Sequence, residues 1–494
     1  MKKRFIYSFC ALMAASAILP SCNKEFLDTA PTDQVAPGLL FTTTKNAMSA
    51  MNGIYRAMYS QYSNQDEGGE GSVMIDMDMM GEDLVNTNAG NGWFNSVYRW
   101  ITHRTVNAGQ VDFVYRYHYR LIANANKILD QIDAATGSEA EKRVIKGEAL
   151  AMRAYAHFKL VQIFAKRWNG DQNTANPQLG VPLLITPDVA ALPRSTVSQV
   201  YAQINTDLDA AIGFLTGATA RSTKSHINLN VAQGIKARVA LTQGNYAVAS
   251  QMAVAARTGY PLMSNADYLA GFNNLANQEW IWGINHIADQ TTFFYSFFAY
   301  MSVNFNSTNI RSNPKAINSA LYNQISATDV RKQLWDPTAA NTSYPVPPSG
   351  SRYPYMNRKF LANSASNSWG DMPFMRSSEM YLIEAEAQAR LGNTAAARTA
   401  LFTVAKQRDA SYVTSVNSGD ALINEILTQR RVELWGEGFR FLDLKRLNLP
   451  LNRNGANHDG TLAGIFEVPA GDVRWEWLIP QAEINNNTLV EQNP

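Results

Sequence analysis

The densest group of charged residues lies near the C-terminus, in the segment ILTQRRVELWGEGFRFLDLKRL from Ile426 to Leu447. Two of its carboxylates, Glu433 and Glu437, stand four residues apart, and a pair of carboxyl groups in an open cleft can hydrolyse a glycosidic bond. The neighbouring arginines would hold both carboxylates ionised, whereas a glycosidase needs one of them as an acid. Spacings of three and four residues also allow ion pairs across the Gly436 to Gly438 break. We therefore favour a buried or half-buried ion network over catalysis for Arg430, Arg431, Glu433, Glu437, Arg440, Asp443 and Arg446.

Other residues that commonly carry chemistry are scattered along the chain. The six histidines form no HExxH motif, and the sequence has no CxxC pair, no GxSxG elbow and no GxxxxGK[ST] loop. Asp76, Asp78 and Gly81 resemble the start of a calcium loop, but Met80 and Thr87 occupy two of its ligand positions. The sequence leaves open a calcium site of another geometry. The sequence predicts a protein that is not an enzyme, with no catalytic residue, no cofactor and no metal site.

Aromatic and amide side chains gather in two irregular segments, and this combination suits the recognition of a sugar. An aromatic face can stack on the C–H face of a pyranose, while amides and carboxylates bind its hydroxyl groups. For each aromatic residue the alternative is burial beneath a loop. The segment EWIWGI is typical of a strand, with Trp280 and Trp282 on one face, and we expect both in the core. The candidate glycan-binding residues are Asn91, Trp93, Asn95, Tyr98, Trp100, Tyr295, Tyr300, Trp369 and Asp371.

The N-terminus has the order of a secretory signal. Lys2, Lys3 and Arg4 precede an apolar stretch, which ends in the string Leu-Pro-Ser-Cys at Cys22. This string resembles a bacterial lipoprotein signal, and the resemblance implies that Cys22 carries lipid and becomes the mature N-terminus. The alternative is a chance cysteine near an ordinary cleavage site. The prediction is a signal peptide over residues 1–21 and an extended, lipid-anchored leader over residues 22–40.

Charge and cysteine content exclude some classes of protein. Without the three basic residues of the signal, 40 of the 43 lysines and arginines remain against 41 acidic residues. A nucleic-acid-binding protein would normally have a basic excess, so nucleic acid is not an expected partner. Of the two cysteines, Cys10 lies inside the signal and Cys22 is the other, so the mature chain can form no internal disulfide. Its stability must come from burial of apolar side chains.

Helical periodicity dominates the rest of the chain. The pattern predicts helices at about 44–62, 111–132, 138–164, 195–215 and 229–258, and a capping box Ser138-x-x-Glu141 opens the third. The turn GNYAVA at Gly244 aligns with GNTAAA at Gly392, with small or apolar residues at equal offsets on both sides. This unit resembles the tetratricopeptide repeat, and an ordinary helical hairpin is the alternative.

The two turns lie far apart in the sequence, so a long insertion separates them. Between the repeats the helical period fades and Asn, Ser, Pro and aromatic residues dominate, which favours functional loops over disorder. The predicted fold class is mainly α, a tetratricopeptide-like helix-turn-helix scaffold with large irregular loop insertions and little β. One domain over residues 41–494 would contain helical repeats at about 41–62, 111–258 and 371–447, and loop regions at about 63–110 and 265–370.

Five separated motifs, together with Cys22 followed by FLD, recur in the order of a known family. The motifs are EALAMRAYAHFKLVQIFA, GVPLL, SSEMYLIEAEAQARLGN, the charged C-terminal block and the closing WLIPQAEINNNTLVEQNP. In these the chain resembles the SusD/RagB family of Bacteroidetes outer-membrane lipoproteins, from Cys22 to Pro494.

The resemblance implies a non-catalytic, cell-surface lipoprotein on the outer membrane. It would capture a glycan nutrient and deliver it to a SusC-like TonB-dependent transporter as its partner. Two alternatives remain: a tetratricopeptide-like protein-interaction lipoprotein, and a peptide-binding transporter lid with no glycan affinity.

Overall fold

The computed structural model describes residues 41–188, 191–219, 221–286 and 294–494. The predicted signal peptide, the leader and Cys22 lie outside the described residues. One buried hydrophobic cluster takes in residues from Ala47 near the start of this range to Val490 near its end. Both ends of the described chain therefore contribute to the same core.

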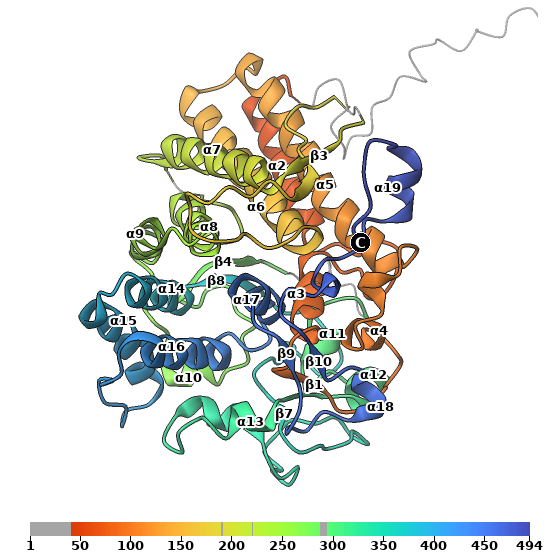
Figure 1. Cartoon of the computed structure of the whole chain (residues 1–494), viewed down its shortest axis with the longest axis vertical. Coiled ribbons are helices and arrows are strands. Elements are labelled where there is room, and N and C mark those ends of the chain that lie inside the picture. The colour runs from red at the N-terminus through yellow and green to blue at the C-terminus, as the bar shows by residue number, and fades with distance from the viewer. Residues whose placement is uncertain (1–40, 189–190, 220, 287–293) are drawn as a thin grey trace, which may run out of the picture.

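A stack of helices forms the scaffold (Figure 1). Consecutive helices pack as neighbours, which is how helix-turn-helix units bury their apolar faces. The scaffold helices are α2 (Thr44–Ala57), α5 (Gly109–Gln131), α6 (Glu139–Phe164), α7 (Val197–Leu215), α8 (Leu229–Thr242), α9 (Tyr246–Ala256), α14 (Ser377–Arg390), α15 (Thr394–Arg408) and α16 (Gly419–Glu433).

Local sequence signals explain how these helices begin and how closely they pack. The predicted capping box is present, because the amide of Glu141 donates to the Ser138 hydroxyl at 3.2 Å and the Glu141 carboxylate accepts from the Ser138 amide. Further along α6, a Cβ at Gly147 would lie only 2.5 Å from Cγ of Leu215. The absence of a side chain there lets α7 approach α6 closely.

The two predicted repeat turns have the same conformation. Gly244 and Gly392 both adopt positive φ angles, 68° and 80°, which glycine accepts without strain. After each glycine, the asparagine amide donates to a carbonyl five residues back at 2.9 Å. Helices α9 and α14 then pack together, and Gln388 Nε2 donates to Ser250 Oγ at 2.7 Å between them. The two repeats, far apart in sequence, therefore stack directly on each other.

The region predicted as a loop before α5 contains a helix, α3 (Glu70–Met79), which is a correction to the predicted boundaries. All ten of its residues are buried. A helix that is covered on every side has no polar face, so its sequence lacks the amphipathic period that identified the other helices.

Short elements connect the longer helices, and most of them lie in the insertion and the C-terminal region. Those of the insertion fill the lower part of the molecule in Figure 1. The short elements are α4 (Asn95–Tyr98), η3 (Thr102–Arg104), η4 (Ile132–Ala134), α10 (Asn265–Tyr268), α11 (Phe298–Met301), α12 (Thr308–Ser312), α13 (Ser319–Tyr322), η6 (Val330–Leu334), α17 (Arg440–Leu447), α18 (Gly460–Ala463), η7 (Val473–Trp475) and α19 (Gln481–Asn486).

The β structure of the described residues is limited to small antiparallel sheets. One has four strands in the order β1-β5-β7-β6, and the others are the pairs β2–β3, β4–β8 and β9–β10. The strands are β1 (Leu84–Asn86), β2 (Leu179–Pro182), β3 (Arg194–Thr196), β4 (Trp280–Ile284), β5 (Lys315–Ile317), β6 (Trp335–Asp336), β7 (Met356–Asn357), β8 (Met372–Arg376), β9 (Leu451–Asn452) and β10 (Glu467–Val468).

Two of these sheets bear on the predictions. Trp280 and Trp282 lie in β4 and are fully buried, which confirms both the strand and the core placement. Strand β1 pairs with β5 in a register that places Leu84 opposite Ile317. This pairing joins the two predicted loop regions, which are far apart in the sequence, into one body.

Candidate functional site

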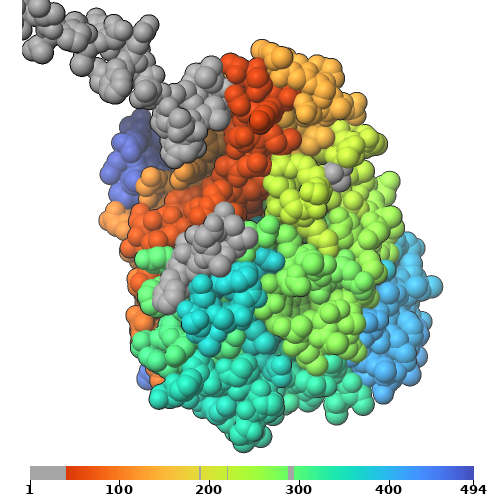
Figure 2. Space-filling view, turned by 180° about the vertical axis from the view of Figure 1, so that it is seen from behind, coloured from red at the N-terminus to blue at the C-terminus, as the bar shows by residue number. Residues whose placement is uncertain are grey.

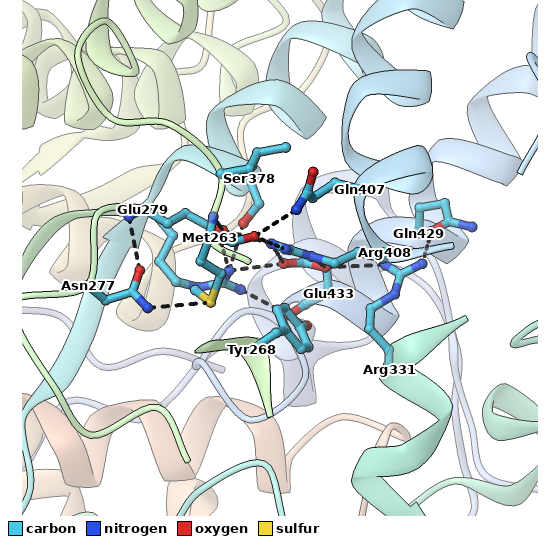
Figure 3. A network of polar contacts seen from close by, with 12 residues as sticks. Met263, Tyr268, Asn277, Glu279, Arg331, Ser378, Gln407, Arg408, Gln429 and Glu433 are labelled. Atoms are coloured by element: carbon cyan, nitrogen blue, oxygen red, sulfur yellow. Dashed lines mark hydrogen bonds and ion pairs between the residues drawn. The ribbon is translucent and has the colours of Figure 1, made fainter. Parts of the chain in front are cut away.

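The charged C-terminal block is buried and forms part of a closed ion network (Figure 3). Glu433 lies against three guanidinium groups, with Arg376 at 2.9 Å, Arg408 at 3.1 Å and Arg331 at 3.3 Å. Burial opposes the ionisation of Glu433, but these three arginines outweigh it and hold its pKa well below the usual value. A carboxyl group held ionised in this way cannot serve as a general acid.

The network is balanced in charge, so it offers no excess charge to a ligand. Its ion pairs join four carboxylates to four cations, and all eight side chains are buried. The members are Glu279, Asp329, Glu433 and Glu437 with Arg331, Lys359, Arg376 and Arg408. They come from α15, α16, η6, β8 and the segments beside them, so the network locks the insertion onto the scaffold. The structural interpretation of the block is confirmed.

The predicted pairing inside the block is only partly correct. Arg446 and Asp443 form the expected short-range pair at 2.7 Å. Arg431 instead pairs with Asp83, and the Arg440 guanidinium contacts Glu82 beside it. The positive φ angles of Gly436 and Gly438 turn the chain between α16 and α17, so Arg431 and Arg440 face the segment after α3. Arg430 pairs with Asp443 across this break at 2.8 Å, as predicted.

The aromatic and amide-rich segments meet on a second, open part of the molecule. We call it the loop surface and define it as residues 86–95, 294–313, 351–353 and 363–371. Seen from behind, the insertion forms the lower face of the molecule in green to cyan, below the N-terminal helices in red (Figure 2). No single stretch of sequence builds this surface, so its rigidity depends on contacts between the segments.

Hydrogen bonds hold residues 86–95 against the insertion. The amide of Thr87 donates to Asn313 Oδ1 at 3.1 Å, and Asn88 Nδ2 donates to the Tyr353 hydroxyl at 3.0 Å. A Cβ at Gly90 would lie 3.0 Å from the Asn313 Cβ, so the backbone also runs close to the residue that follows α12. The segment that carries Trp93 is therefore fixed at several points.

The other segments of the loop surface are joined in the same way. Ser296 Oγ donates to the carbonyl of Ser368 at 2.6 Å, and the amide of Asn306 donates to the carbonyl of Ala365 at 2.7 Å. Tyr295 precedes Ser296 and Trp369 follows Ser368 in the sequence. These two candidate residues therefore lie on segments that are in contact with each other.

Six of the nine glycan-binding candidates have exposed surface. Asn91 is exposed, and Trp93, Asn95, Tyr295, Trp369 and Asp371 are partly exposed. The Asn95 side chain is also ordered locally, because its Oδ1 accepts from Asn86 and its Nδ2 donates to the carbonyl of Ala89 at 2.8 Å. This set combines aromatic rings with amides, the residue types that suit a pyranose.

Three aromatic candidates lie in the core instead of on an exposed platform. The Tyr98 hydroxyl is hydrogen-bonded to His458 at 2.5 Å, and Arg453 lies over its ring. Trp100 Nε1 donates to the carbonyl of Met80 at 3.0 Å, and the Tyr300 hydroxyl donates to that of Gln65 at 3.0 Å. All three side chains are at most 4% exposed. The sequence expectation of an exposed platform is therefore wrong for Tyr98, Trp100 and Tyr300.

The Asp371 carboxylate already accepts hydrogen bonds from the backbone. Its two carboxylate oxygens accept from the amides of Leu275 and His286, both at 2.8 Å. Burial raises the pKa of the Asp371 carboxyl, and the two amides oppose that rise. We correct its expected role, because this carboxylate joins the segments on both sides of β4 to the residue that precedes β8 and has little capacity left for a ligand.

Two residues of the loop surface were missed as candidates. Phe294 is 43% exposed, and its ring lies 6.4 Å from that of Phe305, while Tyr353 is partly exposed and accepts from Asn88. Both lie in aromatic stretches that pointed to a site, but composition alone did not indicate which aromatic residue faces outward.

The described residues do not point to a metal centre or a membrane span. Across the described ranges, no three or more side chains of His, Cys, Asp or Glu gather in a way that could hold a metal ion. Among the same residues, none of the helices combines the length and the apolar character that crossing a bilayer requires.

Comparison with known proteins gives the same family along both halves of the chain. Residues 25–241 match a family model described as starch-binding associating with outer membrane, and residues 272–494 match the model of the SusD family. The chain is 23% identical to the SusD-like protein P2 of Formosa agariphila, over 100% of this chain and 99% of that protein.

Solved structures share the fold over almost the whole chain. A SusD-like carbohydrate binding protein from Bacteroides vulgatus is 25% identical, with a TM-score of 0.79 over 91% of this chain and 98% of that one. A SusD superfamily protein from Bacteroides thetaiotaomicron is 24% identical, with a TM-score of 0.77 over 92% and 100% of the two chains. A laminarin binding SusD-like protein is 20% identical, with a TM-score of 0.70 over 92% and 100%.

These matches agree with the mainly helical fold. The chain belongs to the SusD/RagB family of outer-membrane-associated, carbohydrate-binding proteins, which are not enzymes.

Proposed function

We propose that this protein captures an oligosaccharide on the loop surface and passes it to a SusC-like TonB-dependent transporter in the outer membrane. The observation that carries the proposal is the set of partly exposed aromatic side chains, Trp93, Tyr295 and Trp369, held on segments that are hydrogen-bonded to one another. Aromatic faces fixed in this way can stack on sugar rings at little cost in conformational entropy. Asn91 and Asn95 would bind the hydroxyl groups.

The neighbouring residues of the loop surface are mostly amides and hydroxyls, which suits a neutral sugar. Asn88 and Tyr353 bond to each other, and Asn306 accepts from Arg311 at 3.0 Å, so their geometry is set before a ligand arrives. Preorganised polar groups of this kind give affinity without a large ordering cost. The laminarin binding relative and the starch-binding family description support the same class of ligand.

The proposed anchor is lipid on Cys22, joined to the body by the leader. A fully extended stretch of 19 residues spans at most about 65 Å, which lets the body move over a transporter while it stays on the membrane. The family description, which mentions the outer membrane, supports this placement. In this arrangement the protein faces the cell surface and acts as a tethered lid.

Glycan-array binding followed by titration calorimetry tests the binding role. The full mature chain is used with Cys22→Ala, so that it carries no lipid. We expect at least one oligosaccharide to bind, and the Trp93→Ala and Trp369→Ala variants to bind it more weakly. If the parent protein binds no glycan but copurifies with a transporter, the protein-interaction or peptide-lid alternative replaces this proposal.

Cell fractionation tests the anchor separately. We expect the Cys22→Ala protein to leave the outer-membrane fraction, with the same helical circular dichroism spectrum and the same melting temperature as the parent. An unchanged membrane fraction would contradict the lipoprotein interpretation but would leave the glycan-binding role intact.

A further inference from the structure

A buried lysine lies in the junction between the two main parts of the loop surface. Strand β5 pairs with β1 in a register that places Lys315 opposite Asn86, where residues 86–95 begin. Lys315 is 1% exposed, and its Nζ donates to the carbonyl of Asn313 at 3.2 Å. An amine is therefore enclosed in the contact that holds the segment of Trp93 on the insertion.

Asn313 links this amine to the binding segment. Its carbonyl accepts from the amine, and its side-chain Oδ1 accepts from the amides of Thr87 and Asn88 at 3.1 and 3.3 Å. The carbonyl of the next residue, Pro314, accepts from the Thr87 hydroxyl at 2.7 Å. A displacement of this backbone would therefore act directly on residues 86–95.

Lys315 forms no ion pair with any carboxylate in the described part of the chain. Burial lowers the pKa of its ammonium group from 10.5 to about 7, and no charged neighbour opposes this shift. Near neutral pH the amine therefore exists in both its charged and its neutral form. Three other buried lysines are paired with carboxylates: Lys159 with Glu70, Lys236 with Asp209, and Lys359 with Glu437.

The two forms of the amine fit this enclosed site differently. A protonated lysine has three N–H donors and a neutral one has two, while the Asn313 carbonyl is the one acceptor bonded to Nζ among the described residues. Protonation of Lys315 therefore adds a charge and a further unpaired donor to a site closed to water, and both cost free energy. Water would solvate the charge and bond to the donors if the junction opened.

We propose that Lys315 makes the loop surface sensitive to pH, because a proton on its amine favours opening of the junction between residues 86–95 and the insertion. The proposal rests on the proposed function and adds regulation to it, since the glycan is held more tightly when the amine is neutral. Lys315 is a positioning residue in this scheme. It acts through Asn313 and does not contact the sugar.

The direction of the effect follows from proton linkage. The closed junction keeps the pKa of Lys315 at about 7, whereas an open junction returns the amine to water and to its usual value of 10.5. Between these two pH values the closed form binds fewer protons than the open form, so a rise in pH favours the closed form. The change in this equilibrium is at most about tenfold for each pH unit. Glycan affinity should therefore be lowest below pH 7 and rise above it.

Hydrogen–deuterium exchange measured by mass spectrometry tests the junction without a sugar. The protein is the full mature chain with Cys22→Ala, and the variant adds Lys315→Met, an apolar side chain of similar length. Parent and variant are compared at the same pH, so the intrinsic exchange rates of residues 86–95 cancel. At pH 7 we expect this segment to exchange at least about threefold more slowly in the variant, and at pH 8.5 the difference should shrink.

A matched control is Lys359→Met, which removes the partner of Glu437 at a buried lysine that does have a carboxylate. Lys315→Met should raise the melting temperature, because it removes a buried amine without a counter-charge, whereas Lys359→Met should lower it. Carbon-13 nuclear magnetic resonance of the lysine ε-carbons reports on the parent directly. The signal that is missing in Lys315→Met should titrate near pH 7.

Titration calorimetry measures the regulation of binding. The probe is an oligosaccharide that binds the parent on an array of laminari-, malto-, manno- and xylo-oligosaccharides. From pH 7 to pH 8.5 we expect the affinity of the parent to rise about threefold to tenfold, and that of Lys315→Met to stay constant within about twofold.

The readouts separate the junction from the binding site. If residues 86–95 exchange equally in parent and variant at both pH values, Lys315 does not control the junction and the proposal is wrong, while the glycan-binding role is untouched. If exchange responds as expected but affinity does not change with pH, the regulation of binding is wrong. If no oligosaccharide of the array binds the parent, the proposed function fails and the regulation of binding fails with it, but exchange still decides whether Lys315 controls the junction.

Discussion

Arg376 Nη1 donates to Glu433 Oε1 at 2.9 Å, and both side chains are fully buried. The contact joins the end of β8 to the end of α16. Figure 3 shows Glu433 beside other members of the charge network. Because the network is balanced, removing one carboxylate leaves buried guanidinium charge without compensation. We therefore assign the block a role in holding the insertion on the scaffold.

Glu433→Gln should lower the free energy of unfolding by about 3–5 kcal/mol, the usual cost of breaking a buried ion pair from one side. Urea unfolding followed by circular dichroism measures this change. The matched control is Glu139→Gln. Glu139 also forms an ion pair, with Lys142, but the Glu139 side chain is 82% exposed. That variant should cost less than about 1 kcal/mol. Equal effects of the two variants would contradict a structural role for the network.

Glu148 is a buried carboxyl group whose pKa is raised, in contrast to that of Glu433, so it should make the stability of the protein depend on pH. Burial raises the pKa of this carboxyl from its usual 4.5 to about 7, although Arg221 and the Tyr55 hydroxyl oppose the rise. A group with a raised pKa in the folded state contributes stability below its unfolded pKa and loses it as the pH rises through the folded value. The loss between pH 4.5 and 7 amounts to roughly 3 kcal/mol, at about 1.4 kcal/mol for each pH unit.

Glu148→Gln should therefore match the parent in stability near pH 5 and exceed it at pH 8. Glutamine can still accept from the Tyr55 hydroxyl, which donates to Glu148 Oε2 at 2.8 Å. Urea unfolding of both proteins at the two pH values gives the difference, in which the titration of all other groups cancels. A difference that is the same at both pH values would show that Glu148 does not titrate in this range.

Two helix glycines should respond in opposite directions to the same substitution. In Gly147→Ala the new methyl group meets Leu215, which is 4% exposed, and the resulting overpacking should cost about 1–3 kcal/mol. In Gly213→Ala, in α7, the new Cβ meets no atom of the described chain within 4 Å. That variant should gain about 0.5–1 kcal/mol from helix propensity. Thermal unfolding of both variants checks the close packing of α6 on α7.

Much of the scaffold could be predicted because its signals are local. The capping box at Ser138 and the paired Gly-Asn turns at Gly244 and Gly392 depend on residues within one or two helical turns. Helix α3 could not be found in this way, because its surroundings come from distant parts of the chain and leave it no polar face. The pairing of β1 with β5 could not be found either, because it joins a segment before α5 to a segment after α9.

The candidate site was predictable in composition but not in exposure. Trp93 and Trp100 stand seven residues apart in the same aromatic segment, yet Trp93 is partly exposed and Trp100 is 4% exposed. The ring of Trp100 is covered by Phe441 and Trp475, whose centroids lie 5.8 and 4.9 Å away. These covering residues lie near the C-terminus, so nothing in the local sequence distinguishes the two tryptophans.

The same pair of tryptophans gives the sharpest test of the loop surface. Trp100→Ala should lower the free energy of unfolding by about 3–5 kcal/mol, because it empties a buried site and removes the hydrogen bond to Met80. Trp93→Ala should cost only about 1 kcal/mol in stability. It should weaken the binding of a glycan by roughly tenfold or more, as the loss of an aromatic anchor does.

Stability and affinity must be measured on both variants for the comparison to be informative. Urea unfolding gives the first quantity and titration with the glycan identified on the array gives the second, under conditions in which both variants remain folded. If Trp93→Ala binds as tightly as the parent, the outward face of residues 86–95 is not the binding surface. If Trp100→Ala keeps its stability but loses affinity, the buried placement of Trp100 is wrong, and the aromatic platform extends into what we describe as core.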